Sequence, residues 1–488
     1  MKIAIIGAGI AGLASAVRLA AAGNEVEVFD LNDFPGGKLS EFSLGDYRFD
    51  FGPSLFTMPM YVDELFEICG ENPKEYFDYQ RLTTVCNYFW DDKTSLRAFA
   101  DHTAFANEVE KKLGVKADVI HKTLQRSEEK YNLTGKIFLE NSLHRLKTWI
   151  GFDVLWSMVK IPTLGIFTTL NKENQRLTKN PKLLQLLNRF ATYNGSNPYQ
   201  TSGIMSIIPH FEHTIGAFIP KKGMYDITKS IYELALRKGV KFHFNSRVEE
   251  ILVEKKQANG VRIGEKTMFF DKIVSNCDVF YTYKKLLPTQ RQPERILNQP
   301  KSTSALIFYW GINRSFSELD LHNIFFSQNY KNEFDALAEG NVSDDVTVYV
   351  NITSKYVAGE APEGCENWFV MVNVPHNSGQ DWESIIARTR QNVIEKTSKT
   401  LGIDLEKHIV VEEILDPRTI DSKTHSHLGA LYGNSSNNMM AAFLRHANFS
   451  NHIKNLYFCG GSVHPGGGIP LCLLSAKIVA ENIADEII

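Results

Sequence analysis

The 488-residue sequence predicts an α/β fold, α+β overall, with a Rossmann-like parallel sheet as its first domain. Two glycine-rich turns near the ends of the chain, at residues 7–12 and 460–468, support this prediction, because each follows a short apolar strand and opens a helix. A third apolar strand, in DKIVSNCD at residues 271–278, lies between them. Since long insertions separate these pieces, we expect one domain assembled from discontinuous segments and a second domain built by the insertions.

The first thirty residues form a strand, turn, helix, strand unit. The strand KIAII is followed by Gly7, Gly9 and Gly12 of GAGIAG, by the helical run LASAVRLAAA and by the strand EVEVF, which ends at Asp30. In such units the first glycine permits the tight turn, the second lets a pyrophosphate approach and the third packs the helix on the strand. Asp30 can bind a ribose 2′-hydroxyl, which disfavours NADP. The unit therefore predicts a dinucleotide site.

The remaining pattern indicates how the two domains divide the chain. Residues from about 60 to 215 are typical of amphipathic helices, and those from about 301 to 375 are typical of strands. The strand NLYFCG, the second glycine turn and a last helix follow near the end. We therefore expect a nucleotide-binding domain at 1–90, 220–300 and 410–488, and a second domain at 91–219 and 301–409 with a helical insertion near 115–200.

Composition excludes several classes of partner. The net charge of −3 gives no support to nucleic-acid binding. Six scattered cysteines without paired spacing indicate reduced thiols in a cytoplasmic protein, and the sequence shows no metal-ligand spacing. The first strand begins at Lys2, so we expect no signal peptide. Because no apolar run reaches the ~18 residues of a membrane span, any membrane contact is expected to be peripheral.

The motifs occur in a fixed order over nearly the whole chain: GAGIAG with Asp30, GGK, FDFGPS, NSRVEEI and LYFCGGSVHPGGGIPL. This ordered set resembles the bacterial-type phytoene desaturase family, which consists of FAD-dependent carotenoid desaturases and related isomerases of the flavin amine oxidase superfamily. Within that family, the segments VTVYVNIT and ENWFVMVN are most similar to the branch that introduces a 3,4 double bond into 1-hydroxylated carotenoids.

The resemblance implies one noncovalently bound FAD per chain. The first glycine turn would bind its pyrophosphate and the last its isoalloxazine ring, and the following helix start would place N–H groups and a partial positive charge beside that ring. Residues that match the family's motifs predict the cofactor contacts: Gly7, Gly9, Ala11, Gly12, Asp30, Gly37, Lys38, Ser54, Leu55, Val248, Asn276, Gly461, Gly468, Ile469 and Pro470.

Some of these matches depart from the family's pattern. Asp30 stands where the family more often has Glu, Lys38 where it more often has Arg, and Cys277 where Ala is usual after the strand-end Asn. For Val248 and Leu55 a plain core position is the alternative interpretation.

Candidates for catalysis are Glu140 and His464. Glu140, in FLENS, occupies a place where some family members carry an acid proposed for proton transfer, although Leu143 stands where those relatives carry Arg. A solvated helix face is the alternative for Glu140. His464 lies within the terminal glycine turn, either as a neighbour of the flavin or as a structural residue of the loop.

The helical insertion contains an aromatic and cationic stretch that suits either a bilayer surface or a core helix capping a substrate tunnel. We favour the bilayer, because a carotenoid dissolves only in lipid, and expect the protein at the inner face of the cell membrane. The stretch comprises Lys147, Trp149, Phe152, Leu155, Trp156, Met158, Val159, Lys160 and Ile161.

The resemblance implies an FAD-dependent oxidoreductase acting on CH–CH bonds, a carotenoid 3,4-desaturase with a hydrophobic carotenoid substrate. The terminal electron acceptor, a quinone or oxygen, stays open. The alternatives are a phytoene desaturase or another desaturase or isomerase of the same family, then a flavin amine oxidase, then a non-catalytic lipid escort with the same fold. The intact glycine turn at 466–468 argues against the escort.

Overall fold

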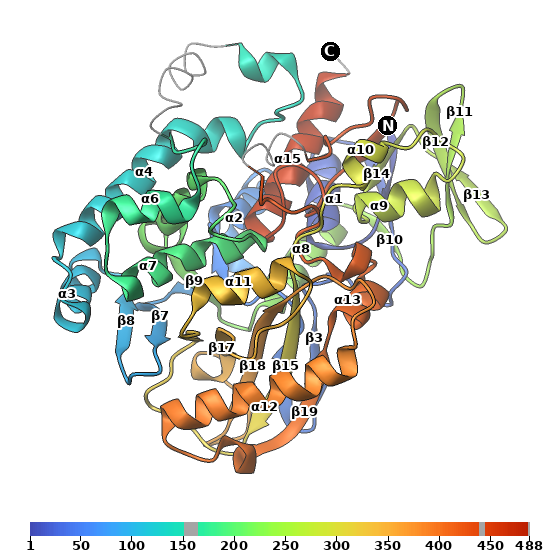
Figure 1. The fold of residues 1–488 in the computed structure, drawn as a ribbon. Helices are drawn as coiled ribbons and strands as arrows, with labels where there is room; N and C mark the ends of the chain where they lie inside the picture. Colours follow the sequence, from blue (N-terminus) through green and yellow to red (C-terminus); the bar gives the residue numbers. More distant parts are fainter. Residues whose placement is uncertain (151–163, 439–444, 487–488) are drawn as a thin grey trace.

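The computed structural model describes residues 1–150, 164–438 and 445–486. Segments from the beginning, middle and end of the chain lie side by side in one five-stranded sheet of order β10-β2-β1-β14-β20 (Figure 1). Every pairing in it is parallel, as the glycine-turn units predict. Its strands are β1 (Lys2–Ile6), β2 (Glu25–Phe29), β10 (Lys241–His243), β14 (Lys272–Ser275) and β20 (Leu456–Phe458).

The first and last helices pack together on this sheet. Helix α1 (Ile10–Ala21) is buried along most of its length and lies against α15 (Ile469–Asp485) and α8 (Tyr225–Arg237), so that the two ends of the chain meet in Figure 1. The alanines of α1 permit this close approach, because a small side chain keeps the helix axes near one another. Helix α2 (Met60–Glu67) completes the layer.

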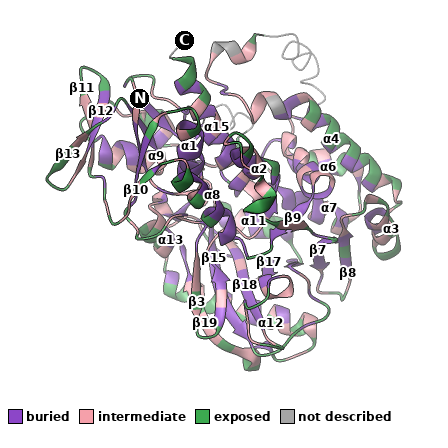
Figure 2. Ribbon diagram, turned by 180° about the vertical axis from the view of Figure 1, so that it is seen from behind, coloured by how far each residue is buried: buried purple, intermediate pink, exposed green. Residues whose placement is uncertain are grey.

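A seven-stranded sheet of order β19-β15-β18-β17-β16-β7-β8 forms the second part of the molecule. Alternate residues of β15 point to opposite faces, with Leu306, Phe308 and Trp310 packed in the cluster that includes α12 (Trp382–Leu401). In Figure 2 β15 and β18 are buried along almost their whole length. The strands are β7 (Thr84–Phe89), β8 (Ser95–Phe99), β15 (Ser304–Ile312), β16 (His322–Phe325), β17 (Val348–Ile352), β18 (Glu366–Val374) and β19 (Ile409–Leu415).

The strands of this sheet come from both sides of two predicted domain boundaries. Strand β7 precedes residue 90, and β19 crosses residue 409. Both pair within the seven-stranded sheet. The division into two domains at the predicted positions stays a prediction.

Helices cover the β7–β8 end of this sheet, in the region predicted as a helical insertion near 115–200 and on both sides of it. They are α3 (His102–Leu113), α4 (Asp118–Phe138), α6 (Leu170–Leu177), α7 (Pro181–Asn188) and the short helices η2 (Leu146–Trp149), η4 (Arg189–Asn194), η5 (Gly203–Ile207) and η6 (His210–Ile215). In the described parts of the chain, none of the helices is both long and apolar enough to span a membrane.

The remaining elements are short. They are β3 (Glu41–Leu44), β4 (Tyr47–Asp50), β5 (Phe56–Thr57), β6 (Tyr79–Arg81), β9 (Ala217–Pro220), β11 (Glu250–Glu254), β12 (Gln257–Ile263), β13 (Lys266–Phe269), α9 (Val279–Tyr281), α10 (Glu294–Leu297), α11 (Tyr330–Ala338), α13 (Pro417–Thr424), η1 (Pro73–Glu75), η7 (Thr282–Leu286), η8 (Thr353–Lys355), η9 (Leu405–His408) and η10 (His427–Gly429).

Candidate functional site

A cavity of about 500 Å³ extends from the glycine turns of the parallel sheet to the inner face of the seven-stranded sheet. Its lining includes all the predicted cofactor contacts except Gly12: Gly7, Gly9, Ala11, Asp30, Gly37, Lys38, Ser54, Leu55, Val248, Asn276, Gly461, Gly468, Ile469 and Pro470. The structure thus brings together residues from seven separate segments of the chain, and their contacts with FAD stay a prediction. Val248 is also part of a hydrophobic cluster and is 5% exposed, so its core interpretation holds beside the cofactor one.

Both glycine turns meet at Asn276, directly after β14. Its amide Nδ2 donates to the Gly7 carbonyl oxygen at 3.3 Å. A Cβ atom on Gly9 would lie 2.7 Å from that Nδ2, and a Cβ on Gly460 would lie 2.9 Å from Oδ1. Glycine at residue 9 therefore leaves room for the Asn276 amide, and the approach of a pyrophosphate to Gly9 stays a prediction. On Gly12 a Cβ would lie 2.1 Å from the Gly7 oxygen, which accounts for glycine where α1 starts against the turn.

Asp30 ties the end of β2 to the first glycine turn. Its Oδ2 accepts from the Ala8 N–H at 2.6 Å and its Oδ1 from the Asn32 N–H at 2.8 Å. Burial raises the pKa of Asp30, against the lowering effect of these N–H donors. The carboxylate lines the cavity with a free lone pair on each oxygen, which suits a ribose hydroxyl.

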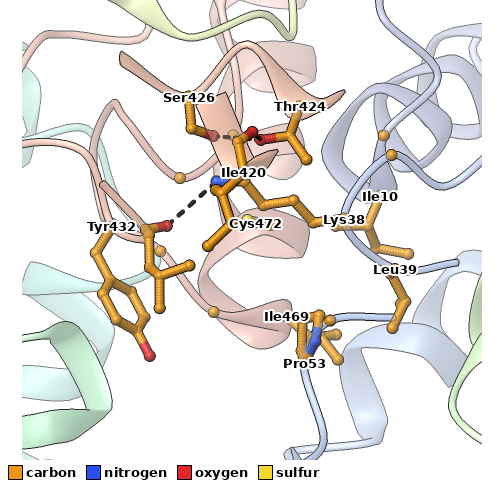
Figure 3. Close-up of a pocket in the computed structure, with 18 of the residues that line it drawn as sticks. Ile10, Lys38, Leu39, Pro53, Ile420, Thr424, Ser426, Tyr432, Ile469 and Cys472 are labelled. Atoms are coloured by element: carbon orange, nitrogen blue, oxygen red, sulfur yellow. Dashed lines mark hydrogen bonds between the residues drawn. The ribbon is translucent and has the colours of Figure 1, made fainter. Parts of the chain in front are cut away.

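Lys38 reaches across the cavity wall, and its Nζ donates to the Leu431 carbonyl oxygen at 3.3 Å (Figure 3). Burial lowers the pKa of Lys38, and Asp278 raises it in part. Among the described residues no carboxylate lies within ion-pair distance of this ammonium. A half-buried cation with one neutral acceptor fits an anionic cofactor, because its other N–H groups need acceptors.

The last glycine turn ends at Gly468, whose φ of +107° favours glycine. A Cβ there would meet no atom within 4 Å and would project into open space. Helix α15 begins at the next residue with Pro470 in its first turn and without a side-chain cap. No side-chain cap therefore accepts from its first N–H groups, which face the cavity with the positive end of the helix dipole. Such a helix start would stabilise the negative charge that the predicted isoalloxazine ring gains on reduction.

Arg445, to which the sequence assigned no role, contacts this last turn, because its Nη1 donates to the Gly461 carbonyl oxygen at 3.4 Å. Its Nη1 donates to the Tyr432 carbonyl oxygen at 3.0 Å, and its Nη2 donates to Ser436 Oγ at 3.1 Å. Burial lowers the pKa of Arg445 to about 10. Arg445 belongs to no recognisable sequence motif, so its contact with the turn could be found only from the structure.

A buried ion pair lies in the cavity wall opposite the glycine turns. Nη2 of Arg189 donates to both Glu212 oxygens at 2.8 and 3.0 Å and to the Tyr88 hydroxyl at 2.8 Å. The Tyr193 hydroxyl donates to the same carboxylate. Burial by itself would raise the pKa of Glu212. The positive charge of Arg189 and the hydrogen bonds to the carboxylate lower this pKa by more, so the net shift is downward. The pair comes from η4 and η6, where the sequence shows only isolated polar residues in apolar surroundings.

A second polar group in this wall joins Ser54, Tyr349 and His322. The Ser54 and Tyr349 hydroxyl oxygens are 2.9 Å apart, and the Tyr349 hydroxyl is 2.8 Å from Nδ1 of His322. All three residues line the cavity. Ser54 was among the predicted contacts, whereas Tyr349 lies in VTVYVNIT, a segment that carried the family resemblance without an assigned role. No role was assigned to His322 from the sequence.

Glu140 and His464 lie outside the cavity lining. The Tyr61 hydroxyl donates to Glu140 Oε1 at 3.2 Å, and His464 Nε2 is 2.9 Å from the carbonyl oxygen of Asn141. Burial lowers the pKa of His464 to about 4, so the ring is neutral near pH 7. His464 thus joins the terminal turn to the segment beside Glu140, and their catalytic roles stay predictions.

Comparisons with known proteins place the chain among flavoproteins. Residues 10–484 match the family described as flavin containing amine oxidoreductases. The chain is 50% identical over 99% of its length to 99% of a 1-hydroxycarotenoid 3,4-desaturase from Flavobacterium sp. (strain P99-3). It is 29% identical over its whole length to 99% of a 4,4′-diapophytoene desaturase from Staphylococcus haemolyticus.

A solved structure extends the likeness to the fold. An oxidoreductase from Methanosarcina mazei superposes with a TM-score of 0.64 at 14% identity, covering 99% of this chain and all of that one. The match of the family over nearly the whole length agrees with the two glycine turns, the half-buried lysine and the open start of α15 along one cavity. The chain belongs to the family of flavin containing amine oxidoreductases, and its cofactor is FAD.

Proposed function

We propose that this protein is a carotenoid desaturase that introduces the 3,4 double bond into a 1-hydroxylated acyclic or monocyclic carotenoid. The observation that carries the proposal is the 50% identity over 99% of both chains to a 1-hydroxycarotenoid 3,4-desaturase. The cavity supports it, because one continuous space joins the predicted flavin contacts to an apolar sheet face.

Different parts of the cavity would bind the cofactor and the substrate. The turns at Gly7 and Gly468, with Asp30 and Lys38, would hold FAD. When bound, FAD supplies an acceptor for the hydride that leaves the substrate. The apolar wall of the seven-stranded sheet would hold the polyene in register and exclude water from the reacting carbons; it includes Ile307, Ile324, Phe369 and Met371.

Incubation with a substrate panel tests the proposal. Purified protein with FAD, in liposomes, is given a 1-hydroxylated carotenoid with a saturated 3,4 bond, its non-hydroxylated parent and phytoene. We expect the absorption maximum of the hydroxylated substrate to move to longer wavelength by the amount for one added conjugated double bond. Equal conversion of phytoene, without preference for the hydroxyl, would contradict the proposal and favour a phytoene desaturase.

We also propose that the protein works at the inner face of the cell membrane, bound peripherally. Two large apolar side chains flank residues 151–163 and are strongly exposed, Ile150 at 80% and Phe167 at 70%. Trp149, beside them, donates its indole N–H to the Leu143 carbonyl oxygen at 3.0 Å. Exposed apolar side chains next to cations are the pattern of an interfacial anchor. The predicted anchor residues Phe152, Leu155, Trp156, Met158, Val159, Lys160 and Ile161 lie outside the described residues.

Flotation with lipid vesicles tests this membrane contact. The double substitution Ile150→Asp and Phe167→Asp should lower the vesicle-bound fraction several-fold, because both side chains lose their favourable transfer into lipid. Phe269→Asp is the matched control, since Phe269 is 64% exposed on β13, away from this region. Equal flotation of the double variant and the control would refute the anchor at this position.

A further inference from the structure

A polar group interrupts the apolar face of the seven-stranded sheet inside the cavity. Ser54 comes from the segment before β5, Tyr349 from β17 and His322 from the start of β16. Strands β16 and β17 are paired, which fixes His322 opposite Asn351. Ser54 and Tyr349 are half-buried, whereas His322 is 3% exposed. The two hydroxyls therefore form the accessible part of the group, and the imidazole lies behind them.

The hydrogen bonds of His322 determine which atom donates and which accepts in the hydrogen bonds that join Ser54, Tyr349 and His322. The Asn351 side-chain nitrogen donates to the Leu321 carbonyl oxygen at 3.2 Å and lies 3.2 Å from His322 Nδ1. Because an amide nitrogen only donates, this contact assigns the lone pair to Nδ1 and the proton to Nε2, which is buried without a hydrogen-bond partner among the described residues. Burial lowers the pKa of His322 to about 4, which keeps the ring neutral at physiological pH. The Tyr349 hydroxyl, 2.8 Å away, therefore donates its proton to Nδ1.

The same reasoning extends to the cavity surface. Since the proton of Tyr349 is committed to His322, the Ser54 hydroxyl donates to the Tyr349 oxygen at 2.9 Å. Both hydroxyl protons are then donated within this group, and the free lone pairs lie mainly on the Ser54 oxygen, because the Tyr349 oxygen already accepts from Ser54. This hydrogen-bonded group thus offers acceptor atoms to the cavity and no free donor. Its complement is a neutral group that donates one hydrogen bond, such as an alcohol.

We propose that Ser54 and Tyr349 bind the hydroxyl group of the 1-hydroxylated carotenoid end and select for it, with His322 as the residue that positions Tyr349. This inference rests on the proposed function. The chemistry of the substrate requires such a site close to the reacting carbons, because only three covalent bonds separate the hydroxyl oxygen from C-3. Ser54, which matches a motif predicted to lie beside the flavin ring, is in the right region for that contact.

The Arg189–Glu212 ion pair, the other polar group of the cavity wall, is a less suitable site for the substrate hydroxyl. Arg189 and Tyr193 both donate hydrogen bonds to the Glu212 carboxylate. At Ser54 and Tyr349, in contrast, a hydrocarbon end would leave two oxygens facing apolar atoms. Sites built to bond a hydroxyl reject the analogue that lacks it much more strongly than apolar pockets distinguish one methylene.

Substitutions that remove one oxygen each test the inference. Tyr349→Phe and Ser54→Ala are compared with wild-type protein on a 1-hydroxylated carotenoid and on its non-hydroxylated parent in identical liposomes. We expect the ratio of the two kcat/KM values to fall about 10- to 100-fold in each variant, because KM for the hydroxylated substrate rises much more than KM for the parent. Binding of the hydroxylated substrate, followed by quenching of tryptophan fluorescence, should weaken in parallel.

Two further variants separate positioning from general damage. His322→Gln retains an acceptor for Tyr349 and should keep more of the preference than His322→Leu, which has none. Tyr356→Phe is the matched control, because the Tyr356 hydroxyl bonds Asp320 at 2.8 Å outside the cavity lining. It should keep the wild-type ratio.

The outcomes distinguish this inference from the proposed function. A wild-type protein inactive on the hydroxylated carotenoid overturns the proposed function itself. A wild-type preference that survives in Tyr349→Phe and Ser54→Ala overturns only the hydroxyl site. An equal loss on both substrates also overturns it, because that result assigns the two hydroxyls to general structure.

Discussion

Protein with Gly9→Val should contain little or no FAD. A Cβ at residue 9 would lie 2.7 Å from Asn276 Nδ2, which holds the Gly7 carbonyl oxygen and packs closely on Gly460. The valine therefore displaces an amide that serves both glycine turns. Overpacking of this kind costs about 1–3 kcal/mol, which corresponds to about a 5- to 150-fold weaker cofactor affinity if the cost falls on the bound state. Flavin released by acid, measured per protein chain, gives the occupancy.

The control for this experiment lies on α1, the helix that Gly9 precedes. Ala21→Val adds the same branched side chain at the exposed end of α1, so flavin content should stay at the wild-type level. Full occupancy in Gly9→Val, together with an unchanged melting temperature, would show that Asn276 can move at no cost and that the turn does not depend on it. Flavin that stays attached after acid precipitation would contradict the noncovalent binding predicted from the sequence.

Arg189→Met should lower the free energy of unfolding by about 3–5 kcal/mol. The substitution leaves the Glu212 carboxylate buried without its cation, and Glu212 is only 1% exposed. Since the pKa of Glu212 is lowered in the folded protein, the stabilisation by the pair is present above the ordinary carboxyl pKa. It is lost as the pH falls through the lowered value. Chemical denaturation of FAD-saturated protein at pH 7 measures the change.

A double variant identifies the cause. Arg189→Met combined with Glu212→Met should recover much of the lost stability, because replacing a whole buried pair by apolar side chains is often neutral. Lys241→Met removes one partner of an exposed ion pair with Glu25 and should cost much less than Arg189→Met, because water and salt screen an exposed pair. If Arg189→Met were no more harmful than Lys241→Met, the buried pair would not stabilise the fold.

The sequence predicted those parts of the site whose signals are local. Gly7, Asp30, Lys38 and Gly468 each belong to a short motif in which residue type, spacing and an adjacent strand or helix suffice to indicate a role. Because such a motif carries its own geometry, the parallel sheet and the family could be predicted from these segments. The fold and the cofactor were confirmed, and the individual contacts with FAD stay predictions.

The tertiary structure decided how distant residues combine. Ser54 and Tyr349 are 295 positions apart, and only the packing of the segment before β5 on the seven-stranded sheet joins them. The strand pattern around Tyr349 indicates burial, yet it does not indicate which hydroxyl faces which partner. Asn276 was predicted as a strand-end residue, but its position between two glycine turns depends on β14 lying between β1 and β20. A chain specifies such contacts only through the whole fold, because each depends on many weak packing interactions that no short segment contains.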